Sequence, residues 1–113
     1  MSDNYFYRTA SVGETVKFPC HTELPQDVNW ERFDTPDSGQ IYIYLADNGL
    51  SHPELYPQIT VLDKNYSHSL VISNVTVSDS AYYRCTEDAG GGNQHTFGLT
   101  VEGIFFKFGK IFI

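Results

Sequence analysis

This chain contains few cysteines and few cationic residues, which excludes several classes of site. It has two cysteines, one tryptophan and one methionine among 113 residues. The lack of a second cysteine pair excludes a four-cysteine zinc site, and the lack of Cys-x-x-Cys excludes a thioredoxin-like redox motif. Cations are also few, since 7 Lys and Arg stand against 14 Asp and Glu, for a formal charge of −7. That balance argues against nucleic acid or an anionic membrane as a non-specific partner.

The two cysteines, Cys20 and Cys85, lie far apart in the sequence. In a small chain rich in β-type residues this spacing favours a structural disulfide, which implies an oxidising compartment. The alternative is a pair of buried free thiols in a cytosolic protein. Asn65 and Asn74 each begin an Asn-x-Ser/Thr sequon, the acceptor pattern for N-glycosylation. We therefore expect an extracellular location, either secreted or in the ectodomain of a membrane protein.

No apolar run reaches the roughly 18 residues that a membrane-spanning helix needs. We expect any membrane attachment to come from a parent segment outside this chain.

Short β-type runs separated by turn signals occur along the whole chain, which favours an all-β sandwich of about nine strands. The length predicts one domain, over residues 1–103, followed by an apolar tail or the start of another segment at 104–113. The expected strands cover residues 5–12, 15–20, 28–33, 40–45, 59–62, 69–72, 81–87 and 94–101, with one or two further strands between Trp30 and Ile59.

Three residue types at set spacing carry a family resemblance. Trp30 follows Cys20 by ten positions, and the stretch Asp79-x-Ala81-x-Tyr83-x-Cys85 surrounds the second cysteine. The chain resembles the V-set of the immunoglobulin superfamily, as found in antigen-receptor variable domains and V-type cell-surface receptors. The resemblance implies a two-sheet antiparallel sandwich, with a Cys20–Cys85 disulfide between the sheets and Trp30 packed against it. It also implies a tyrosine corner, in which the Tyr83 hydroxyl bonds a nearby backbone group.

The chain departs from the family pattern in three places. Residues 57–59 offer no arginine to pair with Asp79, and Lys64 is the nearest cation in that stretch. The Phe-Gly that marks the last strand occurs twice, at residues 97–98 and at 108–109, and we favour the first because residues 90–93 form a tight turn before it. The third departure is the tail at 104–113, which is apolar apart from Lys107, Gly109 and Lys110.

Nothing in the sequence forms a catalytic or metal-binding pattern. The four histidines are scattered, and Gly90-Gly91-Gly92 lacks the Lys-Ser/Thr that a phosphate-binding loop requires. Asp47-Asn48-Gly49 is typical of a hairpin turn rather than a calcium loop. We expect no enzymatic activity, no cofactor and no metal.

The V-type resemblance directs attention to one sheet face for binding. Strict alternation around Trp30 and Cys85 predicts aromatic and arginine side chains on the outer side of that sheet, a composition typical of protein interfaces. The predicted partner-binding residues are Glu31, Phe33, Tyr42, Tyr44, Arg84, Thr86 and Thr96, with Glu31 and Arg84 pairing across the two-fold axis of a dimer. The expected function is a non-catalytic recognition domain of an immune-type or adhesion receptor, which pairs with itself or with a related V-type domain.

Two other readings compete with pairing through the sheet. The loops at one end of the sandwich are an alternative site for a ligand or antigen, through Glu87, Asp88, Gly91 and Asn93. A passive spacer in a modular ectodomain is the third possibility, and it would show no partner.

Overall fold

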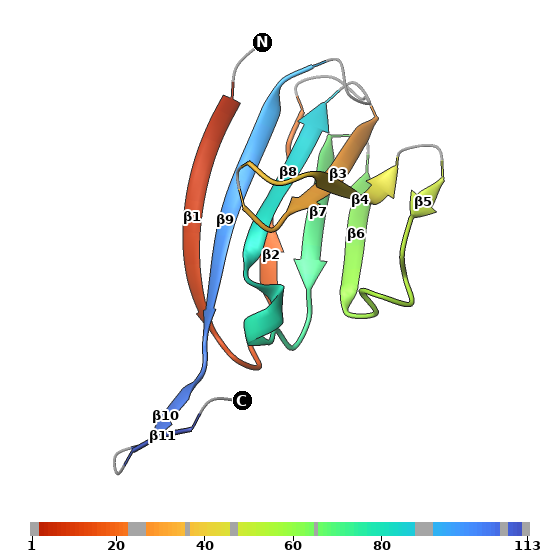
Figure 1. Cartoon of the computed structure of the whole chain (residues 1–113). Helices are drawn as coiled ribbons and strands as arrows, with labels where there is room; N and C mark the ends of the chain where they lie inside the picture. Colours follow the sequence, from red (N-terminus) through yellow and green to blue (C-terminus); the bar gives the residue numbers. More distant parts are fainter. Residues whose placement is uncertain are drawn as a thin grey trace.

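Short strands rich in β-branched and aromatic residues alternate with tight turns along the computed structural model of this chain (Figure 1). The structure describes residues 3–22, 27–35, 37–45, 48–64, 66–87, 92–106 and 109–111. The strands are β1 (Asp3–Ser11), β2 (Val16–Phe18), β3 (Val28–Phe33), β4 (Gln40–Leu45), β5 (Gly49–Leu50), β6 (Ile59–Lys64), β7 (Ser67–Ile72), β8 (Ala81–Glu87), β9 (Gln94–Glu102), β10 (Ile104–Phe106) and β11 (Gly109–Ile111). One 3-10 helix, η1 (Val77–Asp79), precedes β8.

Nine of these strands form the two layers of a sandwich, which confirms the predicted fold class. One sheet has six strands in the order β1-β9-β8-β3-β4-β5, and the other has three in the order β2-β7-β6. All pairings within the two sheets are antiparallel except that of β1, which runs parallel to β9 along its whole length. The first strand therefore belongs entirely to the larger sheet.

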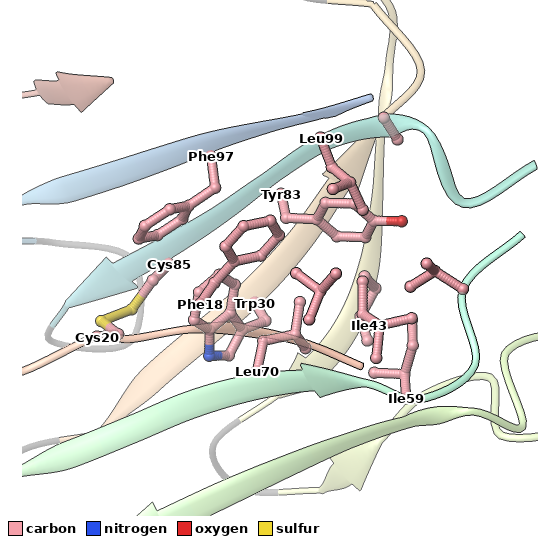
Figure 2. Packing of buried hydrophobic residues seen from close by; sticks show 14 of the residues in the cluster. Phe18, Cys20, Trp30, Ile43, Ile59, Leu70, Tyr83, Cys85, Phe97 and Leu99 are labelled. Carbon is pink, nitrogen blue, oxygen red and sulfur yellow. A yellow bond between two sulfur atoms is a disulfide. The ribbon is translucent and has the colours of Figure 1, made fainter. Parts of the chain in front are cut away.

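A disulfide and stacked aromatic rings join the two layers (Figure 2). Cys20, just after β2, bonds to Cys85 of β8 with their Cα atoms 6.4 Å apart, as the sequence predicted. Phe18 stacks on Phe97 with ring centroids 4.8 Å apart, and the Trp30 ring centroid lies 5.8 Å from that of Phe97. The Trp30 indole N–H donates to the main-chain carbonyl of His68 in the opposite sheet, at 2.9 Å. In the loop-entropy model a bridge of this span stabilises the fold by about 4 kcal/mol.

The last strand of the sandwich contains Phe97 and Gly98, as expected. β9 pairs with β8 over six residue pairs, among them Tyr83 with Phe97. Strands β10 and β11 form a separate hairpin, which lies beyond the end of β9 in Figure 1. The division of the chain at residues 103 and 104 stays a prediction.

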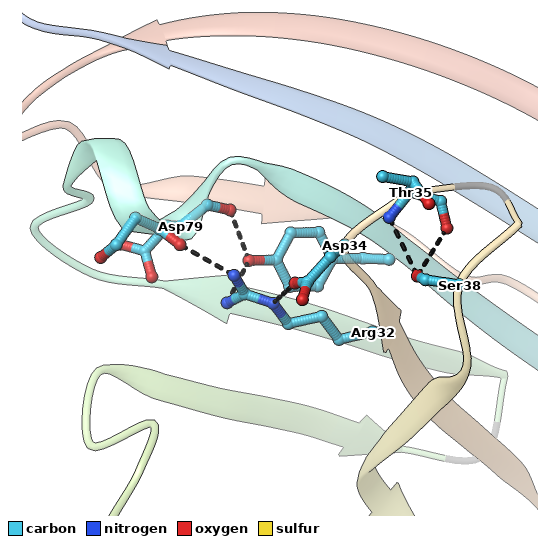
Figure 3. Close-up of polar contacts among 7 residues, drawn as sticks. Arg32, Asp34, Thr35, Ser38 and Asp79 are labelled. Carbon is cyan, nitrogen blue, oxygen red and sulfur yellow. Dashed lines mark hydrogen bonds and ion pairs between the residues drawn. The ribbon is translucent and has the colours of Figure 1, made fainter.

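Arg32 of β3 is the cation beside the tyrosine corner, but it bonds the main chain of η1 (Figure 3). The Tyr83 hydroxyl donates to the Asp79 carbonyl at 2.6 Å, so the predicted corner is present. Arg32 Nη2 donates to the Ser78 carbonyl at 2.8 Å, and its Nη1 donates to the Tyr83 hydroxyl oxygen at 3.3 Å. The Asp79 carboxylate instead accepts the Thr76 N–H at 2.8 Å and caps η1. A cation from β3 therefore satisfies the carbonyl of η1, and the Asp79 side chain has a local role.

A bulge in β4 overturns one expectation from the sequence. Trp30 pairs with Tyr44, but the next residue, Glu31, pairs with Tyr42, so Ile43 is an extra residue in β4. The bulge turns Tyr44 to the inner side of the sheet, where its hydroxyl donates to the Asp63 carboxylate of β6 at 2.5 Å. The prediction that Tyr44 lies on the outer, partner-binding face is therefore wrong.

Candidate functional site: the outer face of the larger sheet

Two rows of side chains cross the outer side of the six-stranded sheet. Strand registers align the first row from β1 through β9, β8 and β3 to β4, and the second row lies two residues away from the first on each of these five strands. We call the ten residues of both rows the outer face. The first row is Tyr5, Thr96, Arg84, Glu31 and Tyr42, and the second is Tyr7, Gly98, Tyr82, Phe33 and Gln40.

Arg84 lies at the centre of the outer face. Its guanidinium carbon is 4.3 Å from the centroid of the Phe33 ring, and its Nε donates to the Thr96 hydroxyl at 3.4 Å. A guanidinium over an aromatic face is attracted by the ring quadrupole and is held in one orientation. The contact presents a cation, already oriented, in the middle of an aromatic surface.

Several predicted partner-binding residues are less accessible than alternation alone implied. Glu31, Phe33, Thr86 and Thr96 are all buried, although their register places them on the outer side of the sheet. The Thr86 hydroxyl donates to the Glu31 carboxylate at 2.9 Å, which gives that buried acid a partner within its own chain. Glu31 and Arg84 are thus both engaged inside the monomer, so the structure offers no free Glu31 for a pair across a dimer axis.

Three tyrosines that the sequence reasoning missed supply most of the accessible aromatic surface. Tyr7 and Tyr5 are exposed, at 75% and 56% of their surface, and Tyr82 is half-buried beside them. They reach this face because β1 pairs with β9, which aligns Tyr7 with Gly98 and Tyr5 with Thr96. The alternating Tyr5-Phe6-Tyr7 pattern was the available signal, but nothing local showed which sheet the strand joins.

Gly98 allows the tyrosines to lie close to the sheet. A Cβ atom at that position would be 2.8 Å from Cδ1 of Tyr7 and 3.1 Å from Cε1 of Tyr82. A hollow of about 180 Å³ lies beside these rings, with Asp34 and Ala81 also on its wall. A smaller hollow of about 30 Å³ lies between Tyr5 and Phe33. The outer face is therefore an uneven aromatic surface with recesses, suited to a complementary protein surface.

Tyr44 belongs to a polar cluster between the sheets rather than to the outer face. Asp63 accepts the Tyr44 hydroxyl through one carboxylate oxygen, while the other lies 2.5 Å from Nδ1 of the buried His68. Burial, reinforced by the hydrogen bond to Asp63, raises the pKa of Tyr44 to about 12. The phenol stays protonated and acts as a donor that links β4 to β6.

At the loop end, the described candidate residues close the β8–β9 hairpin. The Glu87 N–H donates to the Asn93 carbonyl at 2.9 Å, and the Glu87 carboxylate lies 2.5 Å from Nε2 of His95. Two other residues of this alternative site, Asp88 and Gly91, lie outside the described residues. The described part of the loop end is thus occupied with internal contacts.

One of the two sequons is described. Asn74 is exposed in the connection between β7 and η1, in the left-handed region with φ of 49°. Asn65 lies outside the described residues, and glycosylation of either asparagine stays a prediction.

Within the described ranges, no group of three or more His, Cys, Asp or Glu side chains is placed to hold a metal ion. No described helix has the length and apolar character needed to cross a membrane.

Comparison with known families matches the fold and the signature residues. The family profile of the immunoglobulin V-set domain matches residues 6–102, which include both cysteines, Trp30 and all but the first three residues of β1. A search of curated proteins finds no match. V-set domains are typically non-catalytic binding domains, generally for proteins, and the disulfide points to an extracellular location. The chain belongs to the immunoglobulin V-set family.

Proposed function

We propose that this V-set domain is the recognition domain of an immune-type or adhesion receptor, and that it pairs through the outer face with a second copy or a related V-type domain. The observation that carries the proposal is the gathering of five aromatic rings around Arg84 on one sheet face. The rings belong to Tyr5, Tyr7, Phe33, Tyr42 and Tyr82.

The composition of this face suits protein binding. Tyrosine and arginine are enriched at interface hot spots because they cover a large area while losing few rotamers. Tyrosine also tolerates water before binding, because its hydroxyl remains hydrated while its ring is apolar. Tyr42 illustrates this arrangement, since its ring is 40% exposed and its hydroxyl accepts a hydrogen bond from Gln40 Nε2 at 2.8 Å.

The rigidity of the face also supports pairing. Phe33, Glu31 and Thr96 of this face are buried, and Arg84 is held by Phe33. A surface that is ordered before association loses little conformational entropy on binding.

The experiment is sedimentation equilibrium of the purified chain over a wide concentration range. We expect reversible dimerisation, or association with a related V-type domain, that is lost when Tyr7 and Tyr42 are both changed to glutamate. Both side chains are exposed, so circular dichroism should show an intact fold. Tyr66→Glu is the matched control, because Tyr66 is similarly exposed but lies in the turn before β7.

Three results would contradict the proposal. A double variant that associates as the parent chain does would exclude the outer face. A parent chain that stays monomeric at high concentration and binds no V-type partner would support the spacer instead. Loss of ligand binding on replacing residues 90–93, with the outer-face variant unaffected, would favour the loop end.

A further inference from the structure

An apolar groove lies on the other side of β1, away from the outer face. Its volume is about 350 Å³, within the range of about 300–1,000 Å³ typical of ligand sites. Phe6 forms one wall, and Phe18 and Phe97 lie at the base beside Cys20. Phe6 stacks on Phe97 with centroids 5.3 Å apart, yet 52% of its surface is exposed. A large ring that faces inward and still meets solvent indicates a space that the chain does not fill.

The groove exists because the two sheets differ in width. β1 pairs only with β9, and β2 is the outermost strand of the smaller sheet. Among the described residues, no strand pairs with the outer edge of β2 or with the residues that continue it to position 22. The start of β1 therefore extends past the smaller sheet, and Phe6 has no layer opposite it.

Backbone groups along that edge are available for hydrogen bonding. The His68 N–H donates to the Cys20 carbonyl at 2.8 Å, and the Thr22 N–H donates to the Tyr66 carbonyl at 2.9 Å. These bonds show that the backbone N–H and C=O groups of Cys20 and Thr22 face β7. In an antiparallel pair these groups alternate in direction along the strand, so those of Lys17 and His21 face the open edge. Pro19 between them offers a carbonyl and no N–H.

The charges around the groove differ in sign from those of the whole chain. Arg8 lines the groove and Lys17 is exposed on the edge strand, while no Asp or Glu among the described residues lines it, although the chain carries −7 overall. Arg8 has only a loose ion pair with Glu14, at 3.9 Å with both side chains substantially exposed. Such a pair contributes little and exchanges readily with another carboxylate.

From these observations we infer that the groove binds an extended, acidic peptide segment of a partner protein. The segment adds to the open edge beside residues 17–21, places one aromatic or branched aliphatic side chain against Phe6 and Phe18, and pairs a carboxylate with Arg8. Main-chain bonding to an edge strand, with a pocket for alternate side chains, is an established mode of peptide recognition. The site is separate from the outer face, so it does not depend on the pairing proposed above.

The test uses a blocked peptide, acetyl-Thr-Glu-Phe-Glu-Val-Thr-amide, and a matched peptide with lysine in place of both glutamates. Titration calorimetry should show that the acidic peptide binds at least about tenfold more tightly than the basic one. Arg8→Glu should reverse that order, and Phe6→Ser should weaken the acidic peptide by about tenfold. Leu62→Ser is the control and should leave binding unchanged, because Leu62 is exposed on β6, which β7 separates from β2.

Amide hydrogen exchange on the unmodified chain separates strand addition from side-chain contact alone. The bound acidic peptide should slow exchange at the amides of Lys17 and His21, and should leave Cys20 and Thr22 nearly as they are. Absence of binding, binding unaffected by Arg8→Glu, or binding without protection at Lys17 and His21 would overturn the inference. Binding of oleate in preference to both peptides would also overturn it, in favour of a lipid ligand. Because exchange is read on the unmodified chain, the test holds even if Phe6→Ser fails to fold.

Discussion

The guanidinium carbon of Arg84 lies 4.3 Å from the centre of the Phe33 ring, in the middle of a sheet face that also carries four tyrosines. This contact explains why a cation and a buried aromatic ring occupy neighbouring strands on the same side. The ring is shielded from water by the group that it attracts, and the charge stays at the surface where a partner can reach it. The pair therefore connects the stability of the sheet with the shape of the proposed interface.

Replacing Arg84 with methionine should remove the charge while keeping most of the apolar stem. We expect the free energy of unfolding to fall by about 1 kcal/mol, because a partly buried cation–aromatic contact is lost. Urea denaturation at a concentration below any dimerisation measures the change. Arg8→Met is the control, and its exposed ion pair should contribute less than about 0.5 kcal/mol. Equal effects at both positions would contradict this account of Arg84.

Replacing Arg32 with alanine should be much more damaging. Arg32 is 9% exposed and donates to the partly buried Ser78 carbonyl and the buried Tyr83 hydroxyl oxygen, so its loss leaves both acceptors without that donor. We expect a loss of about 3 kcal/mol in chemical denaturation. Arg32→Lys should recover only part of that lost stability, because an ammonium group cannot donate in the forked geometry of guanidinium. Full stability in the lysine variant would show that charge alone suffices.

Gly98→Ala tests the packing of the tyrosines on the outer face. The new methyl group would meet Tyr7, whose exposed ring has room to move away, so we expect a small loss of about 1 kcal/mol or less. If the proposed pairing is correct, the displaced ring should weaken association far more than stability, as sedimentation would show. Gly39→Ala is the matched control, since no atom lies within 4 Å of its Cβ position. The double variant Gly98→Ala/Tyr7→Ser should recover the stability lost in Gly98→Ala, because the ring that meets the new methyl group is gone. If it does not, the methyl group does not clash with Tyr7.

Alkaline pH should destabilise the fold through Tyr44 and Tyr83. The pKa of Tyr44 rises from 10.0 to about 12, chiefly because of burial, and burial raises that of Tyr83 further still. A raised folded-state pKa contributes stability that is fully present below the unfolded value of 10.0. That stability is lost as the pH rises through about 12, because the unfolded chain releases these protons first.

The measurement is tyrosinate absorbance against pH, alongside denaturant unfolding at each pH. We expect two of the eight tyrosines to titrate late in the folded chain. Tyr44→Phe should remove one late-titrating group and flatten the alkaline loss of stability. Titration of all eight tyrosines together near pH 10 while the chain remains folded would contradict the prediction.

Local spacing was enough to predict the parts of this molecule that local geometry controls. Tyr83 lies four residues after Asp79, and its hydroxyl reaches the Asp79 carbonyl as the motif implied. Trp30 and both cysteines occupy the core, because a wide apolar side chain and a crosslink have few other places in a small sandwich. Strand boundaries followed the turn residues closely, and β3, β4 and β8 begin and end where expected.

The candidate site was predicted less well, and the errors have a common cause. The orientation of Tyr44 depends on one extra residue in β4, and an alternating sequence pattern does not show where such a bulge occurs. Tyr5 and Tyr7 join the outer face through a parallel pairing with residues far along the chain. Glu31 and Thr86 are buried and bond to each other across two strands, a pairing that neither strand reveals alone.

The sequence by itself determined the all-β class, the covalent bridge, the tyrosine corner and the V-set family, because each depends on residue type and on spacing along one chain. Only the tertiary structure decided which rings share the outer face, that Arg32 satisfies the carbonyl of η1, and that β2 keeps an open edge beside an apolar groove. These features depend on strand register and on which sheet a strand joins. Register is a property of two strands at once, set by the packing energy of the whole sandwich rather than by either strand's own pattern.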